Sequence, residues 1–172
     1  MSRRSLLATG AAGFAVSATP AFALAQPAVA PALLRRALAA LDQHRGSIEH
    51  RDVIGIADFS LPSRAQRFHL LDVASGRVSS HLVAHGRGSD PAHTGWLERF
   101  SNAPHSNATS AGAYHTDGFY MGGHGRSIRL TGLDAANSNA LERAIVVHGA
   151  WYVSNEMARA HGVLGRSEGC FA

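Results

Sequence analysis

The apolar and polar positions along the chain predict a mainly β domain with short peripheral helices. In residues 32–44, leucines and alanines recur at helical spacing, which predicts a short amphipathic helix ended by Gly46. Two further short helices are predicted, one at 138–143 and one that Ser154 caps and Gly162 ends. Continuous or alternating apolar runs predict strands at 53–59, 67–73, 78–85, 113–121, 127–130 and 144–153.

Residues 86–112 are rich in Gly, Ser, Asn, Pro and His and show no periodicity. The segment is longer than an ordinary connection, so we expect a functional loop. Residues 26–31 are rich in Pro and Ala and predict a linker ahead of the first helix. We therefore predict a linker and helix at 26–49, followed by a single domain at 50–172.

The N-terminus has the pattern of a twin-arginine signal peptide. Arg3 and Arg4 precede an uncharged run that lasts to Ala25, with a small residue at Ala23 to complete a cleavage site. Gly and Pro interrupt this run, so it predicts no stable membrane anchor, although an anchor that is never removed is the alternative. Residues 1–25 are therefore predicted to direct export to the periplasm or cell envelope.

Composition limits the chemistry open to the domain. All sixteen basic residues are arginine, which excludes a catalytic or Schiff-base lysine. Outside the predicted signal peptide, fourteen arginines and twelve acidic residues nearly balance in charge. No run of arginines is interleaved with aromatic residues, so we expect no nucleic-acid partner.

Cys170 is the only cysteine, so an internal disulfide is impossible. It lies in a turn rich in Gly and Ser at 165–172, and His148 ends an apolar strand shortly before. A thiol needs a neighbouring imidazole to be substantially ionised at neutral pH, so this pair predicts a cysteine nucleophile. Backbone N–H groups around Gly169 are suited to stabilising an oxyanion, and Ser167 to hydrogen-bonding within the site. A buried structural cysteine is the alternative.

The same turn contains a G-x-S-x-G pattern, which is typical of serine hydrolases. That nucleophile elbow requires an acidic residue and a histidine later in the chain, and only five residues follow Ser167. We therefore interpret Ser167 as a part of the cysteine site.

Several motifs occur in an order that is typical of one family. His148-Gly149 is followed by a short helix and then by Gly-Arg-Ser-Glu-Gly-Cys-Phe-Ala at 165–172. Further blocks of this pattern lie at 83–89, 109–112, 119–122 and 125–133. Over roughly residues 50–172, the sequence resembles the murein L,D-transpeptidase catalytic domain family (YkuD-like), in its exported subgroup.

The resemblance implies an L,D-transpeptidase-like β-sandwich that acts on peptidoglycan stem peptides without a metal or organic cofactor. In such enzymes a cysteine attacks the amide after the third residue of a stem tetrapeptide, releases D-alanine and forms a thioester. An amine of a neighbouring stem then accepts the acyl group, which gives a 3–3 cross-link. By this resemblance Cys170 is the nucleophile, His148 the general base, and Gly149 the residue whose carbonyl orients the imidazole. The N–H of Cys170, with Gly169 beside it, forms the oxyanion hole.

Family members usually continue past the cysteine for a further strand or more, whereas this sequence ends at Ala172. The resemblance therefore predicts a catalytic domain that is shortened at its C-terminus. An inactive peptidoglycan-binding module or a truncated fragment of an enzyme is the corresponding alternative function.

Four further residues are candidates for substrate binding. Arg126 and Arg129 can bind stem-peptide carboxylates through two hydrogen bonds, although an exposed arginine on a Gly-rich turn is often only solvated. His85, in a Gly-rich turn, is a candidate for lining the cleft. Tyr120 is either a ligand contact or a packing residue.

Eleven histidines leave a zinc-dependent cell-wall amidase as another alternative. However, the sequence contains no H-E-x-x-H motif. His81 and His85 would lie about 13 Å apart on one face of a strand, too far to share a metal ion. We therefore predict no metal site.

Overall fold

The computed structural model describes residues 29–172. The predicted signal peptide at 1–25 and the beginning of the predicted linker lie outside the described residues. Within the described range, no helix is long and apolar enough to cross a membrane.

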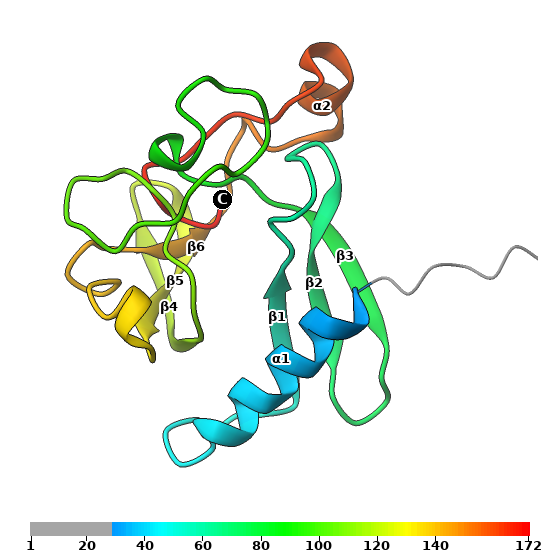
Figure 1. Cartoon of the computed structure of the whole chain (residues 1–172), viewed down its shortest axis with the longest axis vertical. Helices are drawn as coiled ribbons and strands as arrows, with labels where there is room; N and C mark the ends of the chain where they lie inside the picture. Colours follow the sequence, from blue (N-terminus) through cyan, green and yellow to red (C-terminus); the bar gives the residue numbers. More distant parts are fainter. Residues whose placement is uncertain (1–28) are drawn as a thin grey trace, which may run out of the picture.

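Two three-stranded antiparallel sheets form the body of the fold, which confirms the prediction of a mainly β domain. The strand order is β1-β2-β3 in the first sheet and β4-β5-β6 in the second. The strands are β1 (Val53–Ala57), β2 (Gln66–Asp72), β3 (Val78–Leu82), β4 (Tyr114–Gly122), β5 (Gly125–Gly132) and β6 (Val146–His148). In Figure 1 the two sheets lie on either side of the C-terminus.

Helix α1 (Pro31–Gln43) covers one face of the first sheet, as Figure 1 shows. Pro31 occupies the first turn of the helix, where its missing N–H has no intrahelical partner to lose. The apolar face predicted from the spacing, including Leu33 and Leu34, packs against a small core around Ile56 and Leu71. The helix is thus part of the folded domain.

Helix α2 (Asn155–His161) begins and ends at the predicted signals. The Ser154 hydroxyl accepts a hydrogen bond from the Met157 N–H (3.1 Å), and Gly162 ends the helix at φ +72°. These contacts are local, which explains why the sequence pattern predicts them well.

The helix predicted at 138–143 is wrong, because these residues form successive turns after a short 3-10 helix, η2 (Ala135–Asn137). Asn137 is fully buried, and its side chain bonds to the Asp134 N–H (2.9 Å) and the Ala113 carbonyl (2.7 Å). Polar side chains that bond locally to the backbone compete with helix formation. The predicted strand at 144–153 is correspondingly reduced to β6, since Ala144 adopts a positive φ of +54°.

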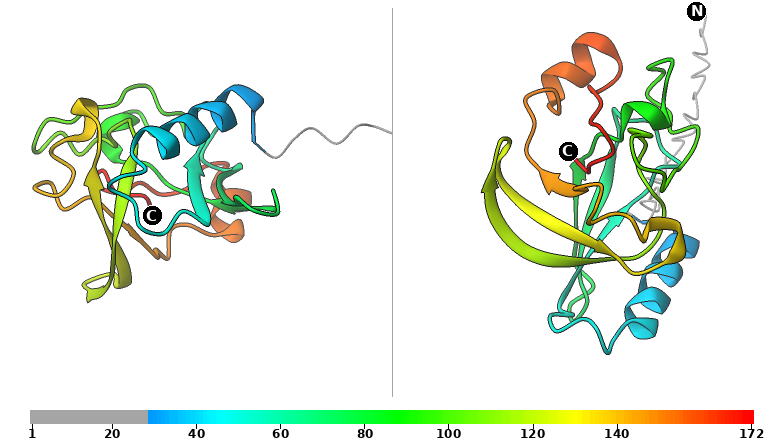
Figure 2. Two further views of the ribbon diagram at one scale, coloured as in Figure 1. Left: turned by 90° about the horizontal axis from the view of Figure 1, so that it is seen from below. Right: turned by 90° about the vertical axis from the view of Figure 1, so that its left-hand side faces the viewer.

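The main core lies between the two sheets and includes the C-terminal segment. Phe171 packs there with four other buried residues: Val83, Leu130, Ala140 and Ile145. The Phe171 carbonyl accepts from the His148 N–H (3.2 Å), while the Ala172 carbonyl accepts from the Ala84 N–H (2.9 Å). The last residues therefore bond to both halves of the fold, and Figure 2 shows them between the sheets.

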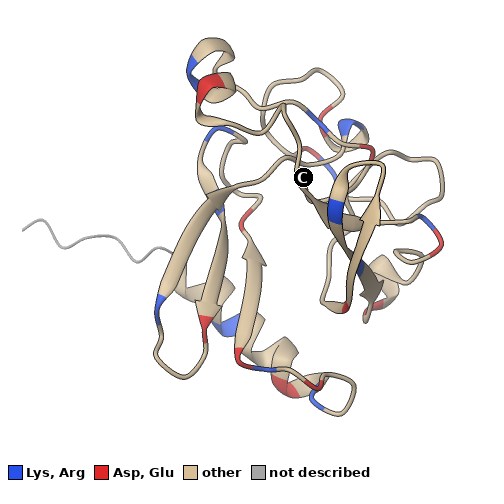
Figure 3. Cartoon of the chain, turned by 180° about the vertical axis from the view of Figure 1, so that it is seen from behind, with Lys and Arg blue, Asp and Glu red and all other residues tan. Residues whose placement is uncertain are grey.

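The long segment between β3 and β4 contains only one short 3-10 helix, η1 (Arg87–Ser89), as the lack of periodicity predicts. Parts of this loop are completely buried, including Ala108 and Thr109. Basic and acidic positions are interspersed over the described residues (Figure 3), in agreement with the nearly balanced charge.

Candidate active site

The turn that carries the cysteine is anchored to the segment after β3. Ser167 forms a parallel bridge with Gly86, and the Ser167 N–H donates to the carbonyl of His85 (3.0 Å). A Cβ at Gly86 would lie 2.3 Å from the Asn107 carbonyl oxygen and 2.7 Å from Gly169 Cα, so only glycine fits there. Gly169 itself has φ +119°, a conformation that favours glycine. Two glycines thus permit the close approach of three backbone segments.

Ser167 fixes the turn internally. Its hydroxyl donates to the carbonyl of Cys170 (2.6 Å) and accepts from the N–H of Gly169 (3.2 Å). This agrees with the expected hydrogen-bonding role of Ser167. It also means that the Gly169 N–H is engaged within the turn, whereas the Cys170 N–H has no acceptor in residues 29–172. Of these two groups, only the Cys170 N–H is available to an oxyanion.

The Cys170 thiol lies beside the strand that leads to His148. Its Sγ is 3.7 Å from the carbonyl oxygen of Ala144, to which the S–H can donate. Burial raises the pKa of the thiol, against the opposite effects of the Val146 N–H and the positive charge of Arg143. In this arrangement the resting thiol is protonated at neutral pH.

His148 is buried at the end of β6, and its ring is held on two sides. Nδ1 lies 2.8 Å from the Gly149 carbonyl, the contact that the family resemblance predicts. The ring also stacks on His124, with 4.3 Å between centroids. Because a carbonyl only accepts, Nδ1 carries the proton and the Nε2 lone pair is free. Burial and, less strongly, His124 lower the pKa of His148, which keeps the imidazole neutral at pH 7.

The backbone places His148 and Cys170 on adjacent segments, with Cys170 level with Val146. Phe171 bridges Val147 in parallel, and its N–H donates to the Val146 carbonyl (3.0 Å). The two side chains are not in contact, however, because Sγ points to the Ala144 carbonyl and no hydrogen bond joins it to the imidazole within the described residues. A contact between Sγ and the imidazole would therefore require the Cys170 side chain to turn away from the Ala144 carbonyl.

Arg143 is a residue near the thiol that no sequence motif marks. Its guanidinium donates to the carbonyls of Ser101 (2.8 Å) and Ala108 and lies against Gly169. In the sequence, Arg143 is distinguished only by its position just before the strand of His148. That position alone indicates no functional role.

A comparison with family models matches residues 25–172 to the L,D-transpeptidase catalytic domain. The chain belongs to this family. The match spans the whole described structure, including α1, and the two-sheet β architecture agrees with it. Comparisons with curated proteins and with solved structures returned no match.

In this L,D-transpeptidase domain, strand register separates the substrate-binding candidates on β4 and β5. Ser127 pairs with both Tyr120 and His148, so these three residues share one face of the sheet. Arg129 is two positions along β5 and lies on that same face, with its guanidinium 4.4 Å from the centre of the Tyr120 ring. Arg126 is one position from Ser127 and lies on the opposite face. Register therefore brings Arg129 and Tyr120, but not Arg126, to the side of the proposed base.

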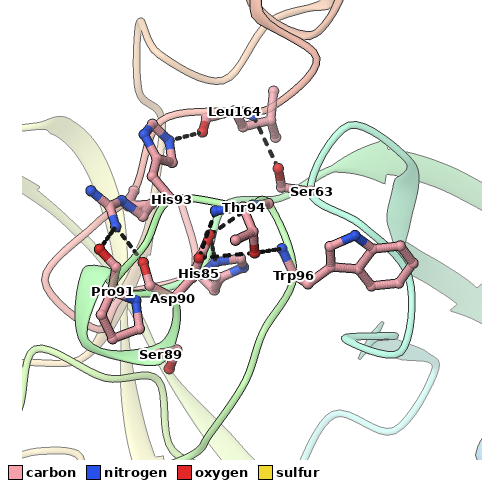
Figure 4. A network of polar contacts seen from close by, with 12 residues as sticks. Ser63, His85, Ser89, Asp90, Pro91, His93, Thr94, Trp96 and Leu164 are labelled. Atoms are coloured by element: carbon pink, nitrogen blue, oxygen red, sulfur yellow. Dashed lines mark hydrogen bonds and ion pairs between the residues drawn. The ribbon is translucent and has the colours of Figure 1, made fainter.

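His85 is only 1% exposed and does not line an open cleft, contrary to the expectation. Its Nδ1 accepts from Arg67 Nη2 (2.7 Å), and its Nε2 lies 3.3 Å from the Asp90 carboxylate. Asp90 in turn accepts from the N–H groups of Thr94 and Gly95, both at 2.8 Å (Figure 4). Burial, helped by the Arg67 charge, lowers the pKa of His85 to about 4, so the ring is neutral at pH 7.

This polar network also holds the start of the cysteine turn. Leu164 donates through its N–H to Ser63 Oγ (3.0 Å) and accepts at its carbonyl from His93 Nε2 (2.8 Å), as Figure 4 shows. Arg166 donates to the main-chain carbonyl of Asp90. The structure thus gives His85 and its partners a supporting role behind the turn.

Metal-ligating residues do not converge in the part of the chain that the structure describes. No group of three or more His, Cys, Asp or Glu side chains in residues 29–172 could hold a metal ion. The described residues therefore offer the zinc-amidase alternative no set of ligands.

Proposed function

We propose that this L,D-transpeptidase domain transfers acyl groups between peptidoglycan stem peptides, with Cys170 as nucleophile and His148 as general base. The observation that carries the proposal is the hydrogen bond from His148 Nδ1 to the Gly149 carbonyl (2.8 Å). It leaves Nε2 free to accept a proton, on a strand whose neighbour carries the thiol.

The chemistry follows from these groups. His148 Nε2 takes the thiol proton, and Cys170 Sγ attacks the peptide carbonyl to give an oxyanion that the Cys170 N–H stabilises. The C–N bond then breaks, the leaving amine of D-alanine takes the proton from His148, and a thioester remains. An amine of a second stem attacks the thioester, gives its proton to His148, and expels the thiolate.

Formation of the reactive pair requires Sγ to leave the Ala144 carbonyl and turn to the imidazole. The raised pKa of Cys170 and the lowered pKa of His148 both favour a neutral resting pair. Proton transfer is then expected when bound substrate excludes water and the new charges are stabilised.

Thiol labelling tests the proposal directly. The chain has one cysteine, so intact-mass measurement of adducts with a carbapenem or with iodoacetamide reports on Cys170 alone. We expect rapid acylation by the carbapenem, which occupies the site as a substrate would, none in Cys170→Ala and slower acylation in His148→Ala. Iodoacetamide reacts with the free thiolate, so we expect it to label the buried, protonated thiol slowly near neutral pH. Transfer from a stem tetrapeptide to an amine acceptor should likewise be fastest in wild type, slower in His148→Ala and absent in Cys170→Ala. Acylation by the carbapenem no faster than that of a free thiol, or transfer that survives Cys170→Ala, would refute the mechanism.

A peptidoglycan-binding module without turnover is a second candidate. The observation that favours it is the lack of a hydrogen bond between Sγ and the imidazole in the described residues. If the chain is such a module, the wild-type protein and Cys170→Ala should sediment equally well with purified peptidoglycan, and neither should form product.

We also propose that residues 1–25 direct export through a twin-arginine route to the periplasm or cell envelope. The support is Arg3-Arg4 ahead of an uncharged run. Replacing both arginines by lysine is expected to retain the chain in the cytoplasm of a bacterial host, as measured by fractionation. Unchanged export of this variant would refute the route.

A further inference from the structure

Arg143 lies where the cysteine turn meets the long loop. Its Nη1 donates to the Ser101 carbonyl (2.8 Å), and its Nη2 donates to the Ala108 carbonyl and to Ser106 Oγ (3.3 Å). A planar guanidinium can satisfy acceptors in several fixed directions, which a lysine ammonium cannot do in the same geometry. The side chain therefore holds residues 101–108 in place.

The same guanidinium lies against the residue that precedes the nucleophile. A Cβ at Gly169 would be 3.1 Å from Arg143 Nη2 and 2.9 Å from the Ala108 carbonyl oxygen, so the turn packs directly on both. The residue after Arg143, Ala144, has a φ of +54°, and its carbonyl oxygen lies 3.7 Å from Cys170 Sγ. Arg143 and Ala144 thus contact the turn on either side of the peptide bond that joins Gly169 to Cys170.

Arg143 is also the positive charge that acts on the thiol. Its charge lowers the pKa of Cys170, against the larger rise caused by burial and a smaller rise caused by Glu168. Glu168 is paired with Arg87 at 3.0 Å, and both side chains are well exposed, which weakens its effect. Two other titratable groups lie near the thiol or on the neighbouring strand: Tyr152 and His148.

We propose that Arg143 is a positioning residue for the nucleophile, which fixes the cysteine turn against the 101–108 loop and places its positive charge beside that turn. It does this without touching substrate, through Gly169 and through its field. The inference rests on the proposed function only in taking Cys170 as the nucleophile. Thiol reactivity can be measured whether or not the chain transfers stem peptides.

The test is the pH dependence of Cys170 alkylation by iodoacetamide in the full chain, from about pH 7 to pH 11, followed by intact mass. Arg143→Met and Arg143→Gln remove the charge, and the glutamine keeps an amide donor for the Ala108 carbonyl. Arg143→Lys keeps the charge and loses the planar fork. Arg99→Met is the matched control, because Arg99 also bonds to a loop carbonyl, that of Gly88 (2.9 Å). Urea unfolding of each variant measures stability separately.

We expect both neutral variants to move the alkylation midpoint to higher pH and to slow the reaction at pH 7 about tenfold. Arg143→Lys should keep the midpoint near that of wild type while unfolding at lower urea, and Arg99→Met should keep the wild-type midpoint. Superimposable pH profiles for wild type, Arg143→Gln and Arg143→Met would overturn the inference, as would an equal shift in Arg99→Met. If the Arg143 variants show these shifts but the wild-type protein never turns over stem peptides, the proposed function is refuted and the role of Arg143 stands.

Discussion

Gly86→Ala tests whether the close contact behind the cysteine turn controls the nucleophile. Gly86 has φ −69°, which alanine adopts freely, so any effect of the substitution is steric. The new Cβ would lie 2.3 Å from the Asn107 carbonyl oxygen and 2.7 Å from the N and Cα atoms of Gly169. All of these atoms belong to the backbone, and no side chain can rotate away to make room.

The size of the effect follows from these distances. Ordinary Cβ contacts begin at about 3.4 Å, so the segments must separate by roughly 1 Å. Overpacking of this kind costs about 1–3 kcal/mol of folding free energy. A 1 Å displacement of a reacting group costs about a hundredfold in rate, and Ser167 of the cysteine turn bonds to both chain neighbours of Gly86, His85 and Arg87. We therefore expect a variant that still folds but is less stable and reacts more slowly.

The assay combines urea unfolding with the rate of Cys170 acylation by a carbapenem. Gly46→Ala is the matched control, since a Cβ at Gly46 meets nothing within 4 Å. We expect Gly86→Ala to lose both stability and acylation rate and Gly46→Ala to lose neither. Wild-type stability together with a wild-type acylation rate in Gly86→Ala would refute the role assigned to this contact.

Three further predictions concern charge and protonation. Arg129→Gln should raise the KM for stem peptides with a free carboxylate about five- to tenfold and leave the KM for amidated peptides unchanged. Arg126→Gln, on the opposite sheet face, should change neither KM, and equal effects of the two variants in steady-state kinetics would contradict this assignment. His124→Phe keeps a stacked ring but removes the imidazole that helps to lower the pKa of His148, so the acidic limb of the pH profile of kcat/KM should move to higher pH. An unmoved limb would argue against His124 as a determinant of this pKa. The pKa of His85 is lowered from 6.5 to about 4, so the unfolded chain takes up a proton that the folded chain does not, and stability should fall as pH drops through this window. Urea unfolding at about pH 7 and pH 4.5 should show this loss and a smaller one in His85→Gln, whereas identical pH dependence of the two would exclude His85 as a cause.

Local signals predicted the peripheral elements well. The apolar spacing of α1, the Ser154 cap and the Gly162 stop are each defined by residues within a turn or two of one another, and all three appear in the structure. The helix predicted at 138–143 failed for a reason that is only partly local. Its preceding residue, Asn137, is buried against the Ala113 carbonyl on a distant part of the chain, and no window of sequence contains that contact.

The candidate site likewise has some features that the sequence predicts and others that depend on contacts between distant segments. Residue type and spacing were enough to nominate Cys170, His148 and their glycine-rich turn, because a lone thiol and an imidazole have little other use in such a pattern. The direction of the Cys170 side chain was not predictable, since it depends on the backbone of Ala144. The role of Arg143 was equally hidden, because the atoms it bonds lie more than thirty residues away.

The sequence by itself determined the family and the mainly β architecture, and it nominated Cys170 and His148 as nucleophile and base, because these follow from residue chemistry and short-range pattern. Only the tertiary structure decided which arginine shares a sheet face with His148 and that His85 is buried in a polar network. It also decided that the thiol rests against a carbonyl rather than the imidazole. These properties depend on strand register and on contacts between distant segments, where a shift of one residue reverses the face of a side chain.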